Sequence, residues 1–456
     1  MTTATAHALQ SSAGHSPWLV VGLGKTGLSV ARFLARRGIA FAVADSRAAP
    51  PGLDELRREL PGVEVKLGAF ELDLFARAHT IVLSPGLAPE TPAVAAARAA
   101  GVPVVGDVEL FALAVDAPVL AVTGSNGKST TTTLVGEMAR RAGKDVRVGG
   151  NLGTPALDLL DHGRPDLYVL ELSSFQLETT ASLDCAAAAV LNLSDDHLDR
   201  HHSLLGYAAV KQRVFQGSGV MVLNADDPLC AAMADARRRV VRFTLSAPRH
   251  GDDFGVRDMD GREWLVHGER ALMPADEVRI PGRHNLTNAL AALALGDAIG
   301  LPVDAMLATL REFSGLPHRC AYVAEIDGVR YYNDSKGTNV GSTLAAIAGM
   351  PGTKLVLIAG GEGKDQDFTP LAAAVAARAR AVVLIGRDAH IIEAALAGAA
   401  PALHATSMDE AVRLAQQSAR PGDVVLLSPA CASFDMFRNY EHRGDTFTAA
   451  VRGLAA

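Results

Sequence analysis

The sequence predicts an α/β protein of three domains, and three observations support this prediction. Apolar runs of strand length alternate with helical patterns along the chain, which is typical of doubly wound parallel sheets. Hydrophobic residues make up 49% of the chain, a composition that suits buried strands covered by helices. The chain has 456 residues, which exceeds one ordinary domain of about 100–200 residues. Each domain is therefore expected to hold an open, largely parallel sheet.

The first predicted domain covers residues 17–109 and is Rossmann-like. Its glycines follow the pattern Gly22-x-Gly24-x-x-Gly27 between a strand and a helix, and the next strand ends in Asp45. This pattern brings backbone close to a diphosphate. Because a hydroxyl and a cation follow, Ser46 and Arg47, a nucleotide-diphosphate substrate is favoured over a nicotinamide cofactor or a purely structural turn. The strands expected here are 18–21, 41–44 and 80–83.

The central domain, predicted over 110–315, contains a short P-loop and is P-loop ATPase-like, with a parallel or mixed sheet. The loop lies between an apolar run and a helix start, where backbone N–H groups and the helix dipole attract phosphate. Lys128 would reach the β- and γ-phosphates, and the Ser129 hydroxyl would sit on Mg²⁺. Two residues separate the glycines, where G-x-x-x-x-G-K-[ST] is usual, so we expect ATP but not an ordinary GTPase. A ligand-free turn is the alternative. The loop residues are Gly124, Ser125, Asn126, Gly127, Lys128, Ser129 and Thr130. The central strands are expected at 117–122, 167–170, 188–191 and 220–223.

Polar residues follow two further strands of this domain. Glu171 comes directly after one strand, and a carboxylate beside a P-loop serine completes a Mg²⁺ site. Ser173 and Gln176 next to it favour a polar cleft, although a surface glutamate is the alternative. His197 follows the next strand and is open between a metal ligand, a hydrogen-bond donor and a loop residue. The local sequence around Lys211 indicates an ordinary surface lysine on a helix.

The third domain is predicted over 316–456 and is Rossmann-like. Three polar loops, 333–339, 360–364 and 428–435, lie at or just beyond the ends of apolar runs. Lysines in two of them, with Arg319 nearby, would suit an acidic small molecule and a polyphosphate if the loops converge. Simple turns are the alternative for each loop. The strands expected here are 329–332, 354–358, 381–385 and 424–427.

Charge and composition exclude several classes of partner. The net charge is −7 and no long Lys/Arg block occurs, which disfavours nucleic acid. No apolar stretch approaches the roughly 20 residues that span a bilayer, so no membrane partner is expected. The four cysteines lie far apart, as in a cytoplasmic protein with reduced thiols. Residues 1–16 lack the basic and apolar regions of a signal peptide and are interpreted as a disordered tail.

Taken together, the motifs resemble those of the Mur ligase family, which builds the peptide stem of the bacterial cell wall. The resemblance runs from about Trp18 to the end of the chain and is marked by the short P-loop. The segment 428–435, continuing through 439–444, resembles the branch that adds D-glutamate. The Asp-Asn-Pro-Arg motif of the diaminopimelate-adding branch is absent from the sequence.

For ATP and metal, the resemblance implies a site that draws on two domains. Lys128 and Ser129 would hold the phosphates and Mg²⁺, with Glu171 on the metal. Lys211 falls where the family has a lysine carbamylated by CO₂, and with His197 it would hold a second Mg²⁺. Further contacts to the nucleotide are implied for Asn288, Arg319 and, near the ribose, Asp334.

For the other two substrates, the resemblance implies UDP-N-acetylmuramoyl-L-alanine and D-glutamate. Phe434 stands where this branch has Leu, and Tyr440 where it has Phe. The residues implied to hold the uridine-diphosphate end are Ser46, Arg47 and Gly86. Those implied for the muramoyl-alanyl portion are Asn151, Ser173, Gln176 and His197. Those implied for D-glutamate are Lys336, Thr338, Lys364, Ser433 and Phe434.

The implied activity is ATP-dependent amide formation through an acyl phosphate, by a cytoplasmic monomer. Three alternatives stay open. The first loop and Asp45 would suit an NAD(P)-dependent oxidoreductase. A non-catalytic nucleotide switch would also use the P-loop. A related Mur ligase that adds another amino acid is the third.

Overall fold

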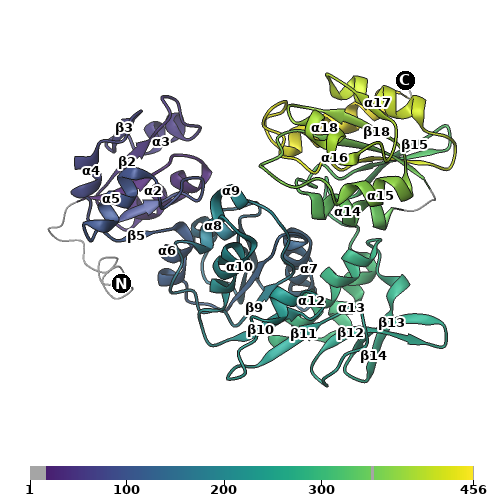
Figure 1. The fold of residues 1–456 in the computed structure, drawn as a ribbon. Helices are drawn as coiled ribbons and strands as arrows, with labels where there is room; N and C mark the ends of the chain where they lie inside the picture. Colours follow the sequence, from purple (N-terminus) through teal and green to yellow (C-terminus); the bar gives the residue numbers. More distant parts are fainter. Residues whose placement is uncertain (1–16, 351–353, 455–456) are drawn as a thin grey trace.

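The structure, a computed structural model, describes residues 17–350 and 354–454. Three sheets follow one another along the chain, and each belongs to a separate α/β body. In Figure 1 the first body (purple) and the third (green to yellow) both flank the central one (teal). The predicted fold class of three α/β domains is confirmed. The predicted tail, 1–16, lies outside the described residues.

The first body has a five-stranded, fully parallel sheet. Its strands are β1 (Trp18–Val21), β2 (Phe41–Asp45), β3 (Glu64–Leu67), β4 (Ile81–Leu83) and β5 (Val104–Val105). Its helices are α2 (Lys25–Arg36), α3 (Leu53–Glu59), α4 (Leu72–Ala76) and α5 (Pro92–Ala99). The strand order is β3-β2-β1-β4-β5. Because the order reverses beside β1, the loop after β1 opens into a crevice at the carboxyl end of the sheet.

The helix α6 (Asp107–Ala114) connects this body to the central one. Its side chains Val108, Leu110 and Phe111 are fully buried, and they belong to an apolar cluster with members from both bodies. Val20 on the first sheet and Val190 on the central sheet lie in the same cluster. Apolar packing thus fixes how the first body sits on the second.

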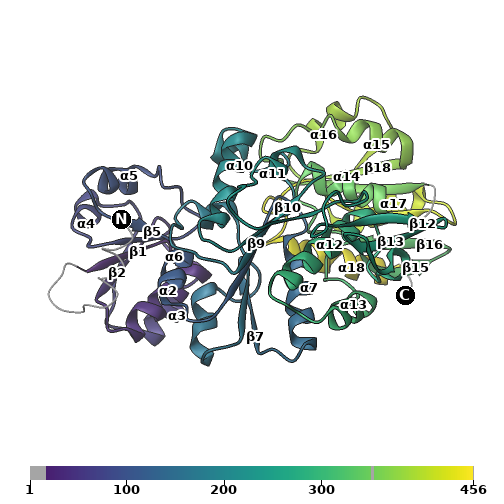
Figure 2. The same cartoon turned by 90° about the horizontal axis from the view of Figure 1, so that it is seen from below.

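The central body has a nine-stranded mixed sheet. Its strands are β6 (Val119–Thr123), β7 (Val146–Gly150), β8 (Leu167–Glu171), β9 (Ala187–Val190), β10 (Val220–Asn224), β11 (Val240–Phe243), β12 (Phe254–Met259), β13 (Arg262–His267) and β14 (Arg270–Pro274). The order is β14-β13-β12-β11-β10-β9-β6-β8-β7, with β12 to β14 as antiparallel hairpins. The helices are α7 (Lys128–Arg141), α8 (Ser174–Leu177), α9 (Leu198–His201), α10 (Leu204–Gln212), α11 (Pro228–Ala231), α12 (Arg283–Ala298), α13 (Val303–Glu312) and the 3₁₀ helices η1 (Ala156–His162), η2 (Arg213–Phe215) and η3 (Ala275–Glu277). Figure 2 shows α7, α12 and α13 grouped beside this sheet.

The third body has a six-stranded sheet and its own two apolar clusters. Its strands are β15 (Ala321–Ile326), β16 (Val329–Asn333), β17 (Leu355–Gly360), β18 (Ala379–Ile385), β19 (Ala402–His404) and β20 (Val424–Leu427). Its helices are α14 (Val340–Gly349), α15 (Leu371–Arg378), α16 (Ala389–Leu396), α17 (Met408–Ser418) and α18 (Tyr440–Gly453). The order is β15-β16-β20-β17-β18-β19, parallel except for β15 with β16.

The register of the central sheet places its polar loops together. On β6 and β8, Val122 pairs with Glu171, and on β6 and β9, Thr123 pairs with Val190. The P-loop, Glu171 and the loop after β9 therefore leave the same edge of the sheet, where doubly wound sheets bind ligands. Across 17–350 and 354–454, the helices are all too short or too polar to cross a membrane.

Candidate active site

The P-loop is shaped by two glycines in backbone conformations that other residues rarely adopt. Gly124 has φ 143° and Gly127, which precedes α7, has φ 83°. A Cβ on Gly127 would lie 2.2 Å from Oδ1 of Asn288. Asn288 on α12 therefore packs directly against the loop, and a side chain at position 127 would be both strained and obstructed.

Lys128 and Ser129 lie at the start of α7, beside Glu171. The Lys128 ammonium donates to the carbonyls of Gly124 and Ser125, each at 2.9 Å. Ser129 donates its hydroxyl to Oε2 of Glu171 at 2.5 Å. Burial lowers the pKa of Lys128. Although burial also favours a neutral Glu171, the Lys128 charge and the hydrogen bond from Ser129 hold the pKa of this carboxyl below its ordinary value.

Two residues from elsewhere complete this group. Asn151, after β7, donates its amide to Oε1 of Glu171 at 2.7 Å. Arg319, just before β15 of the third body, donates Nη2 to the Ser129 hydroxyl at 2.6 Å. A buried, ionised carboxylate and a hydroxyl are oxygen ligands of the kind that Mg²⁺ prefers. Among the residues described, no three His, Cys, Asp or Glu side chains gather as a metal site, so phosphate oxygens and water would have to complete the coordination.

His197 and Lys211 line a small cavity next to the P-loop. His197 has φ 54° and its ring packs edge-on against Phe175. Burial lowers the pKa of His197 to about 4, so its imidazole is neutral at pH 7 and has a lone pair for a metal or a proton.

The sequence-based interpretation of Lys211 as a surface lysine is wrong. Its side chain is 1% exposed, because α10 packs it under the P-loop, where Nζ donates to the Gly124 carbonyl at 2.9 Å. The ammonium also lies 4.5 Å from the Tyr207 ring centroid. Burial, together with the Lys128 charge, lowers the pKa of Lys211 well below its ordinary value.

The third body brings three of its predicted residues to the same place. Lys336 and Thr338 line the small cavity, and the Lys336 ammonium lies 3.8 Å from the Tyr440 ring centroid. Burial and the Arg319 charge lower the pKa of Lys336 to about 8. Lys364 pairs with Asp196, N to O 2.8 Å, beside this cavity.

Ser433 and Phe434 are not brought into this group. Ser433 is buried, Phe434 is 71% exposed, and neither lines the small cavity or the two larger cavities that adjoin it. Phe434, which stands where the D-glutamate-adding branch has Leu, is thus an exposed side chain outside these cavities. The departure at Tyr440 falls on a residue that contacts Lys336.

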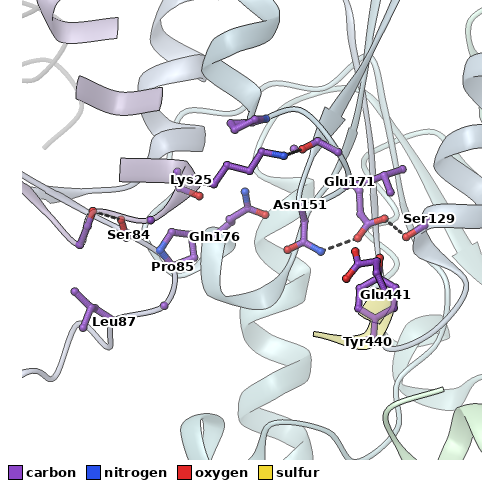
Figure 3. Close-up of a pocket in the computed structure, with 18 of the residues that line it drawn as sticks. Lys25, Ser84, Pro85, Leu87, Ser129, Asn151, Glu171, Gln176, Tyr440 and Glu441 are labelled. Carbon is purple, nitrogen blue, oxygen red and sulfur yellow. Dashed lines mark hydrogen bonds between the residues drawn. The ribbon is translucent and has the colours of Figure 1, made fainter. Parts of the chain in front are cut away.

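Three cavities adjoin one another, and Lys336 lines all of them. The first, of about 690 Å³, lies between the first and central bodies, and Figure 3 shows it ending at Ser129 and Glu171. The second, of about 170 Å³, contains Lys128, His197 and Lys211. The third, of about 490 Å³, lies between the central and third bodies. The second cavity has Glu171 in common with the first and Arg319 in common with the third, so the three form one path.

The outer cavities are lined by most of the remaining predicted residues. The third cavity is lined by Asn126, Gly127 and Thr130 of the P-loop and by Asn288, Arg319 and Asp334. The first is lined by Ser46, Arg47, Gly86, Asn151 and Gln176. Ser173 lines the small cavity and caps α8, where its hydroxyl accepts from the Gln176 backbone.

Asp45 is already engaged within the first cavity. Arg47 donates Nε and Nη2 to its two oxygens at 2.9 and 2.7 Å, and the Leu23 backbone donates at 2.7 Å. Burial opposes ionisation here, but these hydrogen bonds lower the pKa of Asp45 to about 2. An NAD site needs this carboxylate for the ribose hydroxyls, so the geometry disfavours the oxidoreductase alternative.

Sequence reasoning missed three residues of the site. Asp196 accepts from Lys364 and Asn339 of the third body. Tyr207 lies one helical turn before Lys211, a spacing that would have paired them on one helix face. Lys25 lines the first cavity, and its place inside the glycine motif was the available signal.

The fold and site define a multidomain P-loop protein in which one cavity ends at Glu171, another adjoins the P-loop, and Lys336 lines both. Family models match the chain as "Mur ligase MurD-like, N-terminal domain" over 16–106, "Mur ligase middle domain" over 122–296 and "Mur ligase, glutamate ligase domain" over 318–431. The chain belongs to the Mur ligase family.

Curated relatives extend over nearly the whole chain. A protein of Nitrosococcus oceani is 57% identical over 437 residues, 96% of each chain, and is named UDP-N-acetylmuramoylalanine–D-glutamate ligase. A protein of Marinobacter nauticus with the same name is 55% identical, over 96% of this chain and 98% of its own.

Solved structures share the fold at low identity. UDP-N-acetylmuramate-alanine ligase MurC from Thermotoga maritima has a TM-score of 0.60 and 19% identity, covering 96% of this chain and 100% of its own. A pseudomurein peptide ligase type C from Methanothermus fervidus has a TM-score of 0.61 and 18% identity, with the same coverage.

Proposed function

We propose that this chain is an ATP-dependent ligase that joins D-glutamate to UDP-N-acetylmuramoyl-L-alanine in peptidoglycan precursor synthesis. The relatives with this name are 55–57% identical over nearly the full length. The single observation that carries the proposal is the continuous path of three cavities through Glu171 and Arg319. This path gives the UDP-linked substrate, the amino acid and ATP a cavity each, and the three cavities adjoin one another.

The first step is attack of the substrate carboxylate on the γ-phosphorus of ATP, which forms an acyl phosphate and ADP. Carboxylate and triphosphate repel each other, so cations must neutralise the charge that gathers in the transition state. Lys128 would neutralise part of this charge. Its ammonium lies back over the P-loop, where it donates to the carbonyls of Gly124 and Ser125. Ser129 and Glu171 would hold Mg²⁺, which supplies further neutralising charge to the phosphates when bound.

The second step is attack of the D-glutamate amine on the acyl phosphate, which releases phosphate and leaves an amide. We assign the glutamate carboxylates to Lys336 and Thr338, with Lys364 beside them through its pair with Asp196. Ser433 and Phe434 stay predictions from the resemblance. His197, neutral at pH 7, lies in the same small cavity.

A carbamylated Lys211 is part of the proposal. A lysine amine must lose its proton before it attacks CO₂, and the buried Lys211 has its pKa lowered well below the ordinary value. The product carbamate is an oxygen ligand, and with His197 it would suit a second Mg²⁺. We further propose a monomeric, cytoplasmic enzyme, since its substrates ATP and a nucleotide-linked sugar are cytoplasmic metabolites.

The test is a phosphate-release assay with ATP, Mg²⁺, UDP-N-acetylmuramoyl-L-alanine and a panel of amino acids. We expect release that requires both the UDP-linked substrate and D-glutamate, with L-glutamate and diaminopimelate inactive. Release with another amino acid would mean a different Mur ligase. Release without any amino acid or UDP-linked substrate would favour the nucleotide switch.

A further inference from the structure

Lys25 reaches from the first body to the central one at the first cavity. It is the first residue of α2, and its ammonium donates to the backbone carbonyl of Gly153 in the loop after β7. Both residues line the 690 Å³ cavity. Figure 3 shows the Lys25 side chain extended toward that loop. The ammonium therefore lies where the two bodies face each other over the cavity.

The other cations of this cavity are committed elsewhere. Arg47 directs Nε and Nη2 at the carboxylate of Asp45, at 2.9 and 2.7 Å. Lys336 lies against the Tyr440 ring near Glu171, at the reacting end. Lys25 contacts a neutral carbonyl, and within 17–350 and 354–454 no carboxylate forms an ion pair with it. Its charge is the one available to an anion in the middle of the cavity.

The position of Lys25 matches the middle of an extended UDP-linked substrate. The cavity runs from Ser46 at one end to Ser129 and Glu171 at the other. With the nucleoside near Ser46 and the reacting carboxylate near Glu171, the diphosphate lies between them, by the start of α2. The cap residue of α2 is Gly24, which offers no side-chain partner, so the first N–H groups of this 12-residue helix remain for phosphate oxygens.

We propose that Lys25 binds the diphosphate of the UDP-linked substrate and, through Gly153, joins the first and central bodies over it. The inference rests on the proposed function, which supplies that substrate. The carbonyl of Gly153 holds the ammonium in place before binding. A phosphate oxygen then gives Lys25 an oppositely charged partner, whose Coulombic attraction a neutral carbonyl does not supply.

The test is titration of the full-length protein with UDP, followed by calorimetry, for the wild type and Lys25→Met. Methionine keeps the length and apolar stem but removes the charge. We expect the Kd for UDP to rise about tenfold or more, which is typical of losing one charge-assisted hydrogen bond. Lys25→Arg should restore most of the affinity. In 1 M NaCl the difference between wild type and Lys25→Met should shrink, because exposed charges are then strongly screened.

Ser29→Ala is the matched control for a purely structural role. Ser29 donates to Asp158 at 2.5 Å, so it also links α2 to the central body, but it does not line the cavity. UDP affinity should stay near the wild-type value in this variant. Equal UDP affinity in wild type and Lys25→Met would overturn the inference, and so would equal weakening by Ser29→Ala.

Turnover separates this inference from the proposed function. In the D-glutamate assay, Lys25→Met should raise KM for the UDP-linked substrate while kcat and KM for ATP change less than about twofold. A wild type that lacks D-glutamate-dependent phosphate release would refute the ligase, whereas the UDP titration would still decide the role of Lys25.

Discussion

At the scale of single residues, Lys128 carries the most direct prediction. Its ammonium lies over the P-loop, and in the proposed function its removal would leave the γ-phosphate charge without a side-chain partner. Lys128→Ala should lower kcat for phosphate release by about 100-fold or more, while UDP affinity changes little. Lys144→Ala, an exposed lysine just after α7, is the control. Turnover near the wild-type rate in Lys128→Ala would show that the P-loop assignment is wrong.

Lys211 allows a chemical rescue experiment. If the Lys211 carbamate is a ligand of the second Mg²⁺, Lys211→Ala should lose at least about 100-fold in kcat, and added acetate or formate should restore part of it by supplying the missing carboxylate. Gln212→Ala, at the exposed neighbouring position, should leave activity unchanged. Full activity of Lys211→Ala in CO₂-depleted buffer would refute the carbamate.

The residues predictable from sequence are those at or shortly after the ends of strands. Glu171 and Ser129 could be placed because a parallel sheet brings its strand ends to one edge. Lys211 could not, because its burial depends on how α10 packs under a loop 87 residues earlier in the chain. Asp196 acquires its role from Lys364 in another domain, and no local pattern encodes that contact.

At the scale of elements, the helix α6 predicts a pH effect on stability. Asp107 begins α6, is 2% exposed, and has one oxygen without a hydrogen-bond partner among the described residues. Burial raises its pKa from 3.8 to about 6. Because the folded state binds this proton more tightly, the carboxyl costs stability as pH rises from about 4 through 6.

Asp107→Asn should therefore gain stability relative to the wild type across that pH range. The pKa difference corresponds to at most about 3 kcal/mol, and loss of ideal hydrogen bonding to Gln176 will reduce the gain. Thermal unfolding midpoints of both proteins at pH 4.5 and pH 7.5 measure the effect. A difference between the proteins that does not change with pH would show that Asp107 ionises normally in the folded state.

Periodicity found the buried strands and missed the exposed ones. The run predicted as a strand at 117–122 corresponds to β6, and the run predicted at 167–170 corresponds to β8. The strands β12 to β14 were not predicted, because one end of each strand is exposed and the apolar run is interrupted there. Such strands are stabilised by pairing with their hairpin partners, and a search for local apolar runs does not detect this pairing.

At the scale of the whole molecule, the site is divided between bodies, and among the described residues the central and third bodies have no apolar cluster in common. The third cavity, which we propose as the ATP site, takes Asn126 and Asn288 from the central body and Asp334 from the third. Polar contacts hold these two bodies together, such as Arg319 with Ser129 and Asn339 with Asn126. Polar contacts between domains allow the domains to move relative to one another. We therefore expect bound ligands to change how closely the central and third bodies pack together.

Hydrogen exchange measured by mass spectrometry can test which bodies each ligand contacts. A non-hydrolysable ATP analogue with Mg²⁺ should slow exchange in two segments, 124–130 of the P-loop and 333–339 of the third body, because both border the nucleotide cavity. At about 100 times its Kd, the analogue stabilises the bound state by about 2.7 kcal/mol, enough to slow exchange about 100-fold wherever opening requires the ligand to leave.

UDP should instead protect 22–27 and 150–153, on the two sides of the first cavity, and leave 333–339 unchanged. If the analogue protected 124–130 alone, the central body would bind ATP without the third body. The contact between these two bodies would then tighten when the amino acid binds.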